Sequence, residues 1–340
     1  MENALTSAVV RQELIPLSEA AKWQAALQNI PHAFGHTWEN CYAMHLTTGY
    51  PTYLYLLQSG DTKVVCPLAE RVYRGFKDIV TPYGFSGFVS NTDFPDFQNY
   101  WLRFAAQAGY VCGYIGLNSV LLSEININLT EVVISNRLYV LDLRLPIQEL
   151  YQNLNKGRKR QLKKFEERKQ MYTLEKKGLK EFFLAQYHDF FSARGAASTY
   201  NFSIPTLSYL IDLNEIILIG HSENGEIKAV SIFAYTAHMG EYLFNVSLPG
   251  YENQAASLLW YGALLLKEKH VPYFNLGGGV KPGDSIASFK QRFGPLDVPL
   301  TCLKQVYQEA PYTALCEQAQ VDPADKQSFF PPYWRVNSQQ

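Results

Sequence analysis

The chain has 340 residues, more than one hydrophobic core usually serves, so its length favours two domains of about 150 residues each. Hydrophobic residues make up 47% of the sequence and charged residues 18%, which excludes a wholly disordered chain. The formal net charge of -1 gives no overall attraction to nucleic acid or to an anionic membrane. A site for an anion must therefore come from a local cluster of basic residues.

The cysteines lack the close pairs of a zinc site or a disulfide framework, and most stand among apolar residues. We therefore expect reduced, structural thiols. The sequence does not begin with a basic segment followed by an apolar one, and no run approaches the roughly 18 apolar residues that a membrane span needs. These features predict a cytoplasmic protein without a membrane span. The cysteines are Cys41, Cys66, Cys112, Cys302 and Cys316.

The first half of the chain predicts helices followed by a sheet. Thr37 is placed to cap a helix that starts at Trp38. Segments rich in β-branched and aromatic residues indicate strands, and turn residues around Tyr83 and Gly84 then interrupt regular structure. In chain order we expect helices at 20–28 and 38–44, strands at 52–57, 62–73 and 77–81, a helix at 94–108, and strands at 110–116 and 138–143.

The second half predicts a regular succession of elements. They are two helices, three antiparallel strands, a crossover helix, a strand, a helix and a strand, an order that resembles the GNAT acyltransferase fold. The half opens with a strongly basic helix, expected at 147–171. After it we expect helices at 179–194 and 205–213, strands at 215–221, 227–236 and 241–248, a helix at 254–269, a strand at 272–276, a helix at 285–292 and a strand at 298–307.

Three consecutive glycines, Gly277 to Gly279, follow the expected strand at 272–276 and allow the backbone to come close to a ligand. They form neither a Walker loop nor a dinucleotide fingerprint, because the spacings of those motifs are absent. Together with SFKQRFGP at 288–295, the turn resembles the FemAB-like acyltransferases, which have two GNAT-like halves, an LGGG turn and an FKxxFG motif. The resemblance covers roughly residues 37–307 and includes the basic helix with Arg158 and the turn at Tyr83.

The resemblance implies an α/β (α+β) fold of two tandem GNAT-like domains, each a mixed, mainly antiparallel sheet flanked by helices. We place these domains at 1–145 and 146–340, the second with the acyl-donor site and a Pro-rich tail. The implied chemistry is transfer of an acyl group from a thioester or an ester to an amine, with the acceptor between the two halves. The donor is aminoacyl-tRNA in the peptidoglycan-branching members and acyl-coenzyme A in others.

Three residues are candidates for the chemistry itself. Lys290 stands where the family has a functionally important lysine, and its ammonium group would stabilise the oxyanion that forms during amine attack; the alternative is a solvated lysine. Asn245 is a candidate to hold the acyl carbonyl. The amine must lose a proton, for which His188, beside Asp189, is the candidate base and water the alternative. No histidine has a metal-ligand spacing, so we expect no metal.

The acyl donor is expected at the start of the crossover helix. GNAT proteins bind the pyrophosphate of coenzyme A there, with backbone N–H groups and the positive end of the helix. The usual GNAT signature, an Arg or Gln followed by GxG or GxA, is missing from this chain. We expect acyl-coenzyme A as a co-substrate bound by Gly250, Asn253, Gln254, Ala255 and Ala256.

Basic and aromatic residues are candidates for binding the acceptor. Lys156, Arg158 and Arg160 could bind the phosphate oxygens of a nucleotide sugar, or form a solvated basic face that Glu166 and Glu167 partly balance. Candidate stacking walls for a base or a sugar are Trp38, Tyr83, Tyr200 and Tyr242.

We hypothesise acyl-coenzyme A-dependent N-acylation of a nucleotide-linked amino sugar, such as a dTDP- or UDP-amino-deoxy sugar, for bacterial surface polysaccharide. This hypothesis needs no nucleic-acid partner. One alternative is aminoacyl-tRNA-dependent transfer to a peptidoglycan precursor, and another is an inactive GNAT-like scaffold that binds a ligand. The sequence leaves the oligomeric state open and is compatible with a monomer.

Overall fold

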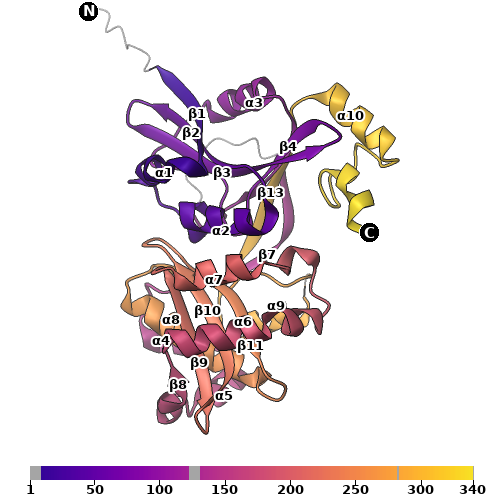
Figure 1. Ribbon diagram of the computed structural model, residues 1–340. Helices are drawn as coiled ribbons and strands as arrows, with labels where there is room; N and C mark the ends of the chain where they lie inside the picture. The colour runs from indigo at the N-terminus through magenta and orange to yellow at the C-terminus, as the bar shows by residue number, and fades with distance from the viewer. Residues whose placement is uncertain (1–8, 122–130, 282, 340) are drawn as a thin grey trace, which may run out of the picture. The chain divides into compact units, whose positions relative to one another are not determined.

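The computed structural model in Figure 1 describes residues 9–121, 131–281 and 283–339. The chain forms two compact units. Unit 1 consists of Met1–His45, Gly49–Ser135 and Leu300–Gln340, and unit 2 of Leu46–Thr48 and Asn136–Pro299. This division differs from the predicted domains, 1–145 and 146–340, mainly in that the chain returns to unit 1 at Leu300. The return has a physical cause, because residues 301–306 pair with a strand of unit 1.

The sheet of unit 1 is mixed and mainly antiparallel. Its order is β1-β2-β3-β4-β6-β13, and the short strand β5 pairs with β3. Strands β4 and β6 are the parallel pair, and their connection crosses over through helix α3. The strands are β1 (Val10–Pro16), β2 (Thr52–Ser59), β3 (Thr62–Tyr73), β4 (Phe76–Val80), β5 (Val89–Ser90), β6 (Tyr110–Leu117) and β13 (Leu296–Val306).

Helices cover both faces of this sheet. Residues that alternate along β2 pack on opposite sides: Leu54 contacts the cluster of α1 and α2, whereas Tyr55 contacts α3. As predicted, Thr37 caps α2, because its hydroxyl accepts a hydrogen bond from the Asn40 N–H at 3.2 Å. The helices are η1 (Leu17–Glu19), α1 (Ala20–Leu27), η2 (Phe34–His36), α2 (Trp38–Thr48), α3 (Phe97–Gln107), α10 (Glu309–Gln318) and η7 (Pro332–Gln339).

The C-terminal segment is fixed to unit 1 by a buried carboxylate. Asp78 on β4 is fully buried and accepts hydrogen bonds from Arg71 Nε at 2.7 Å, Tyr333 Oη at 2.9 Å and Trp334 Nε1 at 2.7 Å. Because Arg71 and Asp78 are partners across β3 and β4, the sheet aligns them. This carboxylate therefore joins two strands to η7.

Unit 2 contains the sheet that matters most for the predicted donor site. Its order is β7-β12-β11-β10-β9-β8, with β11 and β12 parallel and the other described pairs antiparallel. The predicted class, α/β with mixed, mainly antiparallel sheets flanked by helices, is confirmed. The strands are β7 (Val132–Asp142), β8 (Tyr172–Thr173), β9 (Ile216–Glu223), β10 (Glu226–Tyr235), β11 (Gly240–Ser247) and β12 (Tyr273–Asn275).

Two helical layers flank this sheet. Helices α6 (Lys176–Ser192) and α7 (Ile204–Asp212) cross one face (Figure 1), where Phe183 and Tyr187 pack against Phe244. Helix α8 (Ala255–Glu268) lies on the other face, where the Phe233 ring leaves no room for a side chain at Gly262. The smaller elements η5 (Ser198–Tyr200), η6 (Glu252–Gln254) and α9 (Ser285–Gln291) complete the unit. We call these faces the α6 face and the α8 face.

The basic helix predicted at 147–171 is three separate elements. They are α4 (Ile147–Asn153), α5 (Lys156–Leu162) and η4 (Glu166–Met171). Helix α4 ends before Leu154 because the backbone of that residue is extended, with ψ at 141°. The Asn155 side chain then caps α5 by accepting a hydrogen bond from the Arg158 N–H at 2.8 Å. Helix α5 is therefore a separate helix, and the orientation of its basic residues does not follow from that of α4.

The five cysteines are buried and unpaired, as predicted. Burial raises the pKa of each thiol, which leaves the thiols protonated and unreactive at neutral pH. In the described ranges, no helix is both long enough and apolar enough to cross a membrane.

The Asp78 cluster makes a prediction for stability. Asp78→Ala would leave the Arg71 guanidinium buried without its carboxylate and should lower the free energy of unfolding by about 3 to 5 kcal/mol. Urea denaturation measures this loss. Asp297→Ala is the matched control, because Asp297 pairs with Arg137 at 2.6 Å on the surface and its loss should cost under about 1 kcal/mol. Equal costs for the two variants would contradict the role given to Asp78.

Candidate functional site

Strands β11 and β12 separate shortly after they meet. They pair only at Gly240 with Phe274 and at Glu241 with Asn275, and β11 then continues to Ser247. The described residues give this later part of β11 no strand partner on the side away from β10. Every second peptide group along that edge is therefore open to a ligand.

A β-bulge in β11 decides which side chains share a face. Tyr242 is opposite Phe233 and Phe244 is opposite Ile232, so Leu243 is the extra residue. Tyr242 and Asn245 therefore lie together on the α8 face, where Asn245 Oδ1 accepts a hydrogen bond from Ser231 Oγ at 2.9 Å. The structure thus brings a predicted catalytic residue and a predicted substrate residue to one surface.

The glycine turn follows β12 and lies against β7. A side chain at Gly278 would place its Cβ 2.5 Å from the Arg137 carbonyl oxygen, so only glycine fits there. Asn136 Nδ2 donates to the Gly279 carbonyl at 2.9 Å and fixes the turn from the other side. The glycines therefore shape the backbone of this turn.

Lys290 binds this turn directly. Its side chain, 9% exposed, donates from Nζ to the Gly278 carbonyl oxygen at 2.6 Å. Burial lowers the pKa of Lys290 to about 8, and the nearby Asp284 carboxylate acts in the opposite direction. Lys290 is therefore not a solvated lysine, which was the alternative interpretation of the sequence.

Arg158 is buried beneath α9 rather than exposed to a phosphate. It is 3% exposed, and its guanidinium lies over the rings of Phe289 and Phe293 at 4.5 and 4.2 Å. Its Nη2 donates to the Phe289 carbonyl at 3.0 Å, next to Lys290 in the chain. Burial lowers the pKa of Arg158 to about 10, so it remains charged at neutral pH. Arg158 therefore positions α9, whereas Lys156 and Arg160 on the same helix are exposed.

A further hydrogen bond connects α5 to the start of α8. Arg158 Nη1 donates to Gln161 Oε1 at 2.6 Å, and Gln161 Nε2 donates to the Asn253 carbonyl at 2.8 Å. Gly250 in the same turn has a positive φ of 87°, and no side chain caps the first N–H groups of α8. Ala255 and Ala256 are buried in the first turn of α8, and Gln254 is half-buried before it. The predicted pyrophosphate turn is thus linked to the lysine and glycine site.

Glu241 is a candidate that the sequence did not reveal. Its carboxylate is 1% exposed and lies on the α6 face where β11 and β12 separate, beside the fully buried Asn275. Strict alternation would put Glu241 on the same face as Asn245, and only the bulge places them on opposite faces. The sequence did offer one signal for this candidate, because Glu241 is an acidic residue at the first position of the strand predicted at 241–248.

Two predicted residues of unit 2 lie away from the α8 face. His188 is exposed on α6, with its ring edge-on to Tyr187. Tyr200 stacks on Phe191, and its carbonyl accepts from Tyr187 Oη at 2.7 Å, which also places it on the α6 side. Among the contacts of the described residues, none joins His188 to Lys290, so water, the alternative acceptor, or another residue would take the proton.

In unit 1, three side chains donate hydrogen bonds to alternate backbone carbonyls of the turn that contains Tyr83. Asn40 Nδ2 donates to the Tyr83 carbonyl at 2.9 Å, Asn118 Nδ2 to that of Phe85 at 3.1 Å, and His36 Nε2 to that of Gly87 at 3.2 Å. Burial lowers the pKa of His36 to about 3, so the ring is neutral. Its Nδ1 accepts from the Ala33 N–H, which leaves the proton on Nε2. This turn is therefore rigid, and the Tyr83 ring is 37% exposed.

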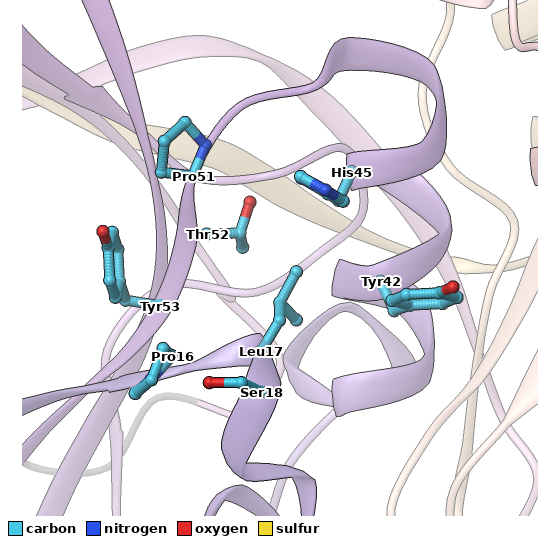
Figure 2. Close-up of a pocket in the computed structure, with 8 residues that line it drawn as sticks. All are labelled: Pro16, Leu17, Ser18, Tyr42, His45, Pro51, Thr52 and Tyr53. Atoms are coloured by element: carbon cyan, nitrogen blue, oxygen red, sulfur yellow. The ribbon is translucent and has the colours of Figure 1, made fainter.

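A small pocket of about 340 Å³ lies elsewhere in unit 1, between β1, α2 and β2 (Figure 2). Figure 2 shows the Leu17 side chain between Tyr53 and the two α2 residues Tyr42 and His45, and the Tyr42 hydroxyl pointing away from the pocket. Trp38 stacks on Tyr42 with ring centroids 4.9 Å apart and donates to the Leu17 carbonyl at 2.8 Å. Trp38 therefore contacts two residues that line this pocket but does not line the pocket itself.

The described part of the chain has no group of three or more His, Cys, Asp or Glu side chains placed to hold a metal ion. The candidate site contains hydrogen-bonding groups and three buried charged residues, Lys290, Arg158 and Glu241.

The depressed pKa of Lys290 predicts how stability changes with pH. The unfolded chain keeps this ammonium up to its ordinary pKa of 10.5, whereas the folded protein releases the proton near pH 8. Between these values the folded protein binds fewer protons, so its stability relative to a Lys290→Met variant should rise with pH, by up to about 3 kcal/mol. Urea denaturation of both proteins over this range measures the effect. A difference that stays constant with pH would contradict it.

Comparisons with known proteins support the fold. No protein-family model and no curated protein matches the chain. The chain is similar to the crystal structure of FemX, with a TM-score of 0.67 over 89% of this chain and 99% of that one at 9% identity. The structure of L-PGS from Bacillus licheniformis matches with a TM-score of 0.55 over 89% and 97% at 16% identity. The C-terminal domain of a putative lysylphosphatidylglycerol synthetase from Agrobacterium fabrum matches at 0.54 over 85% and 91%, also at 16% identity. These likenesses show the fold alone: the chain shares its fold with these structures over nearly its whole length.

Proposed function

We propose that the protein is an N-acyltransferase that transfers an acyl group from acyl-coenzyme A to the amine of a nucleotide-linked amino sugar. The observation that carries this proposal is the gap beside β11, with the Lys290-bound glycine turn on one side of it and the uncapped start of α8 at its end. An extended donor can pair with the open edge of β11 along this gap. Its phosphates would then reach the turn from Gly250 to Ala256.

The donor's pyrophosphate fits the start of α8 for two reasons. The first N–H groups of the 14-residue helix point towards it, and the positive end of the helix dipole attracts an anion. Asn253 is held by Gln161, so the turn is already ordered. The small side chains of Ala255 and Ala256 permit close approach of the backbone to the ligand.

In the proposed reaction, the amine nitrogen attacks the thioester carbonyl carbon and forms the new C–N bond. The tetrahedral intermediate collapses, the C–S bond breaks, and the coenzyme A thiolate leaves. Lys290 would stabilise the oxyanion electrostatically, and Glu241 would accept the proton that the amine loses. Glu241 replaces His188 in this role because Glu241 lies where β11 and β12 separate, whereas His188 does not.

For the acceptor, we propose that the phosphates bind exposed side chains of α5, Lys156 and Arg160, without the buried Arg158. Exposed guanidinium and ammonium groups suit a diphosphate, because charge-assisted hydrogen bonds to phosphate are strong.

Aminoacyl-tRNA is the second candidate donor, and one observation favours it. The exposed basic residues continue beyond α5 into η4, including Lys163, Lys164 and Arg168, which gives a larger basic surface than a single diphosphate needs. Amide formation from acyl-coenzyme A or from charged tRNA, followed in parallel with the same amino-sugar acceptors, separates the two. Product from charged tRNA alone would contradict the proposed donor.

Lys290→Met should lower kcat by about 10²- to 10³-fold with little change in the KM of the acceptor, because it removes charge stabilisation of the transition state. Steady-state kinetics measures both constants. Lys290→Arg is the matched variant, since it keeps the charge and a donor for the Gly278 carbonyl and should retain more activity. A rise in the KM of the donor with unchanged kcat would instead show that Lys290 only holds the turn.

Glu241→Gln should lower kcat by about 10²- to 10⁴-fold, because the amide cannot accept the proton from the amine. Glu268→Gln on the exposed end of α8 is the control and should leave kcat unchanged. Equal kcat values for the wild-type protein and Glu241→Gln would remove Glu241 from the mechanism.

A further inference from the structure

Unit 2 contains an apolar groove that the proposed reaction does not use. It has a volume of about 690 Å³ and lies between α4, the α5–η4 segment and α8. Its walls include the half-buried Tyr151 and the almost completely buried Phe165 and Trp260. Tyr151 and Trp260 meet edge to face, with ring centroids 6.1 Å apart, which gives the groove a firm aromatic floor. Its polar lining consists of two lysines, two carboxylates and two amides: Lys163, Lys169, Glu166, Glu268, Gln148 and Gln152.

The segment along one side of this groove is strongly basic. Residues 156–169 contain eight basic and two acidic side chains, a net charge of 8 − 2 = +6. Two of the basic side chains are used internally, since Arg158 binds α9 and Lys159 Nζ donates to the Gln152 carbonyl at 2.7 Å. The other six are exposed: Lys156, Arg160, Lys163, Lys164, Arg168 and Lys169.

These exposed cations are scarcely neutralised within the protein. Among the described residues, the ion pair found in this segment is Lys169 with Glu166, whose charged atoms are 4.0 Å apart. Both residues are well exposed, so this pair binds weakly. The exposed cations of this segment therefore favour binding of an anionic group, and the groove beside them favours binding of an apolar group.

We propose that this face binds anionic phospholipid at a bilayer surface, with the phosphate of one lipid between Lys163 and Lys169 and part of its acyl chain in the groove. An anionic lipid satisfies both halves of the site. The long lysine side chains can cover apolar surface while their ammonium groups reach the headgroup phosphates. RNA would satisfy the cations but presents no aliphatic chain for the groove, and the groove's aromatic rings are too buried to stack on bases.

The test is co-sedimentation of the full-length protein with phosphatidylcholine vesicles that contain or lack phosphatidylglycerol. The protein should bind the phosphatidylglycerol vesicles, and added salt should weaken this binding. Lys163→Glu/Lys169→Glu should reduce the affinity by at least about tenfold. Arg11→Glu/Arg103→Glu changes the net charge equally at exposed positions of unit 1 and should bind like the wild-type protein.

A second pair of variants tests the groove independently of net charge. Ile147 lines the groove and is 44% exposed at the start of α4, whereas Ile204 is 43% exposed at the start of α7. Ile147→Glu should weaken vesicle binding several-fold, and Ile204→Glu should not. Thermal unfolding confirms that each variant is folded.

Two results would overturn the proposal. One is vesicle binding that is equally strong with and without phosphatidylglycerol, or that the lysine variant leaves unchanged. The other is a lysine variant that loses affinity for uncharged tRNA while its vesicle binding is unaffected, which would make this face an RNA site. Neither result depends on the proposed acyl transfer, because no donor or acceptor is present.

Discussion

The hydrogen bond from Lys290 to the Gly278 carbonyl is the contact on which the candidate site depends. It joins α9 to the turn that follows β12, and Arg158 secures the same helix from below through the Phe289 carbonyl. Gln161 then extends this connection to Asn253 at the start of α8. The buried side chains of Lys290 and Arg158 and the exposed side chain of Gln161 thus connect α5, the glycine turn, α9 and the start of α8. Replacement of Lys290 would therefore alter the positions of both the glycine turn and α9.

Burying two cations in one region is costly for stability. Desolvation lowers the pKa of both Lys290 and Arg158, and Arg292 adds repulsion at Arg158. Carboxylates would offset this cost well, yet the hydrogen bonds that both cations make in the described structure go to backbone carbonyls and one amide. Residues with such perturbed pKa values concentrate at functional sites, because a charge left without a full counter-charge can act on a ligand. This is a physical reason to favour an active site over an inactive scaffold.

Sequence reasoning succeeded where local patterns decide the structure. The cap at Thr37, the burial of the cysteines and most strands of both sheets follow from residue type and alternation, whereas β1 (Val10–Pro16) and the short β5 (Val89–Ser90) were not among the predicted strands. The glycine turn and the motif at 288–295 gave the fold through their resemblance to a family. These features depend on residues near each other in the chain, or on a motif that is recognisable without its surroundings.

What the sequence could not supply depends on contacts between distant segments. Alternation alone cannot reveal the bulge at Leu243, because the extra residue is defined by pairing with β10. Arg158 resembled a phosphate ligand among basic neighbours, yet the rings of α9, some 130 residues later, bury it. The return of β13 to unit 1 likewise requires its pairing with β6. His188 was chosen for its chemistry, and the fold placed it on an exposed surface.

The bulge also constrains how the proposed reaction can be arranged. It places Glu241 on the α6 face and leaves Tyr242 and Asn245 on the α8 face. In the proposed reaction, Glu241 and Lys290 would then act from opposite sides of the gap beside β11. An acyl group in that gap would meet the ammonium of Lys290 on one side and the proton acceptor on the other. The amine must then attack from the α6 face, because its proton has to reach Glu241. Without the bulge, the regular alternation of β11 would put Glu241 and Asn245 on one face, and this arrangement would be lost.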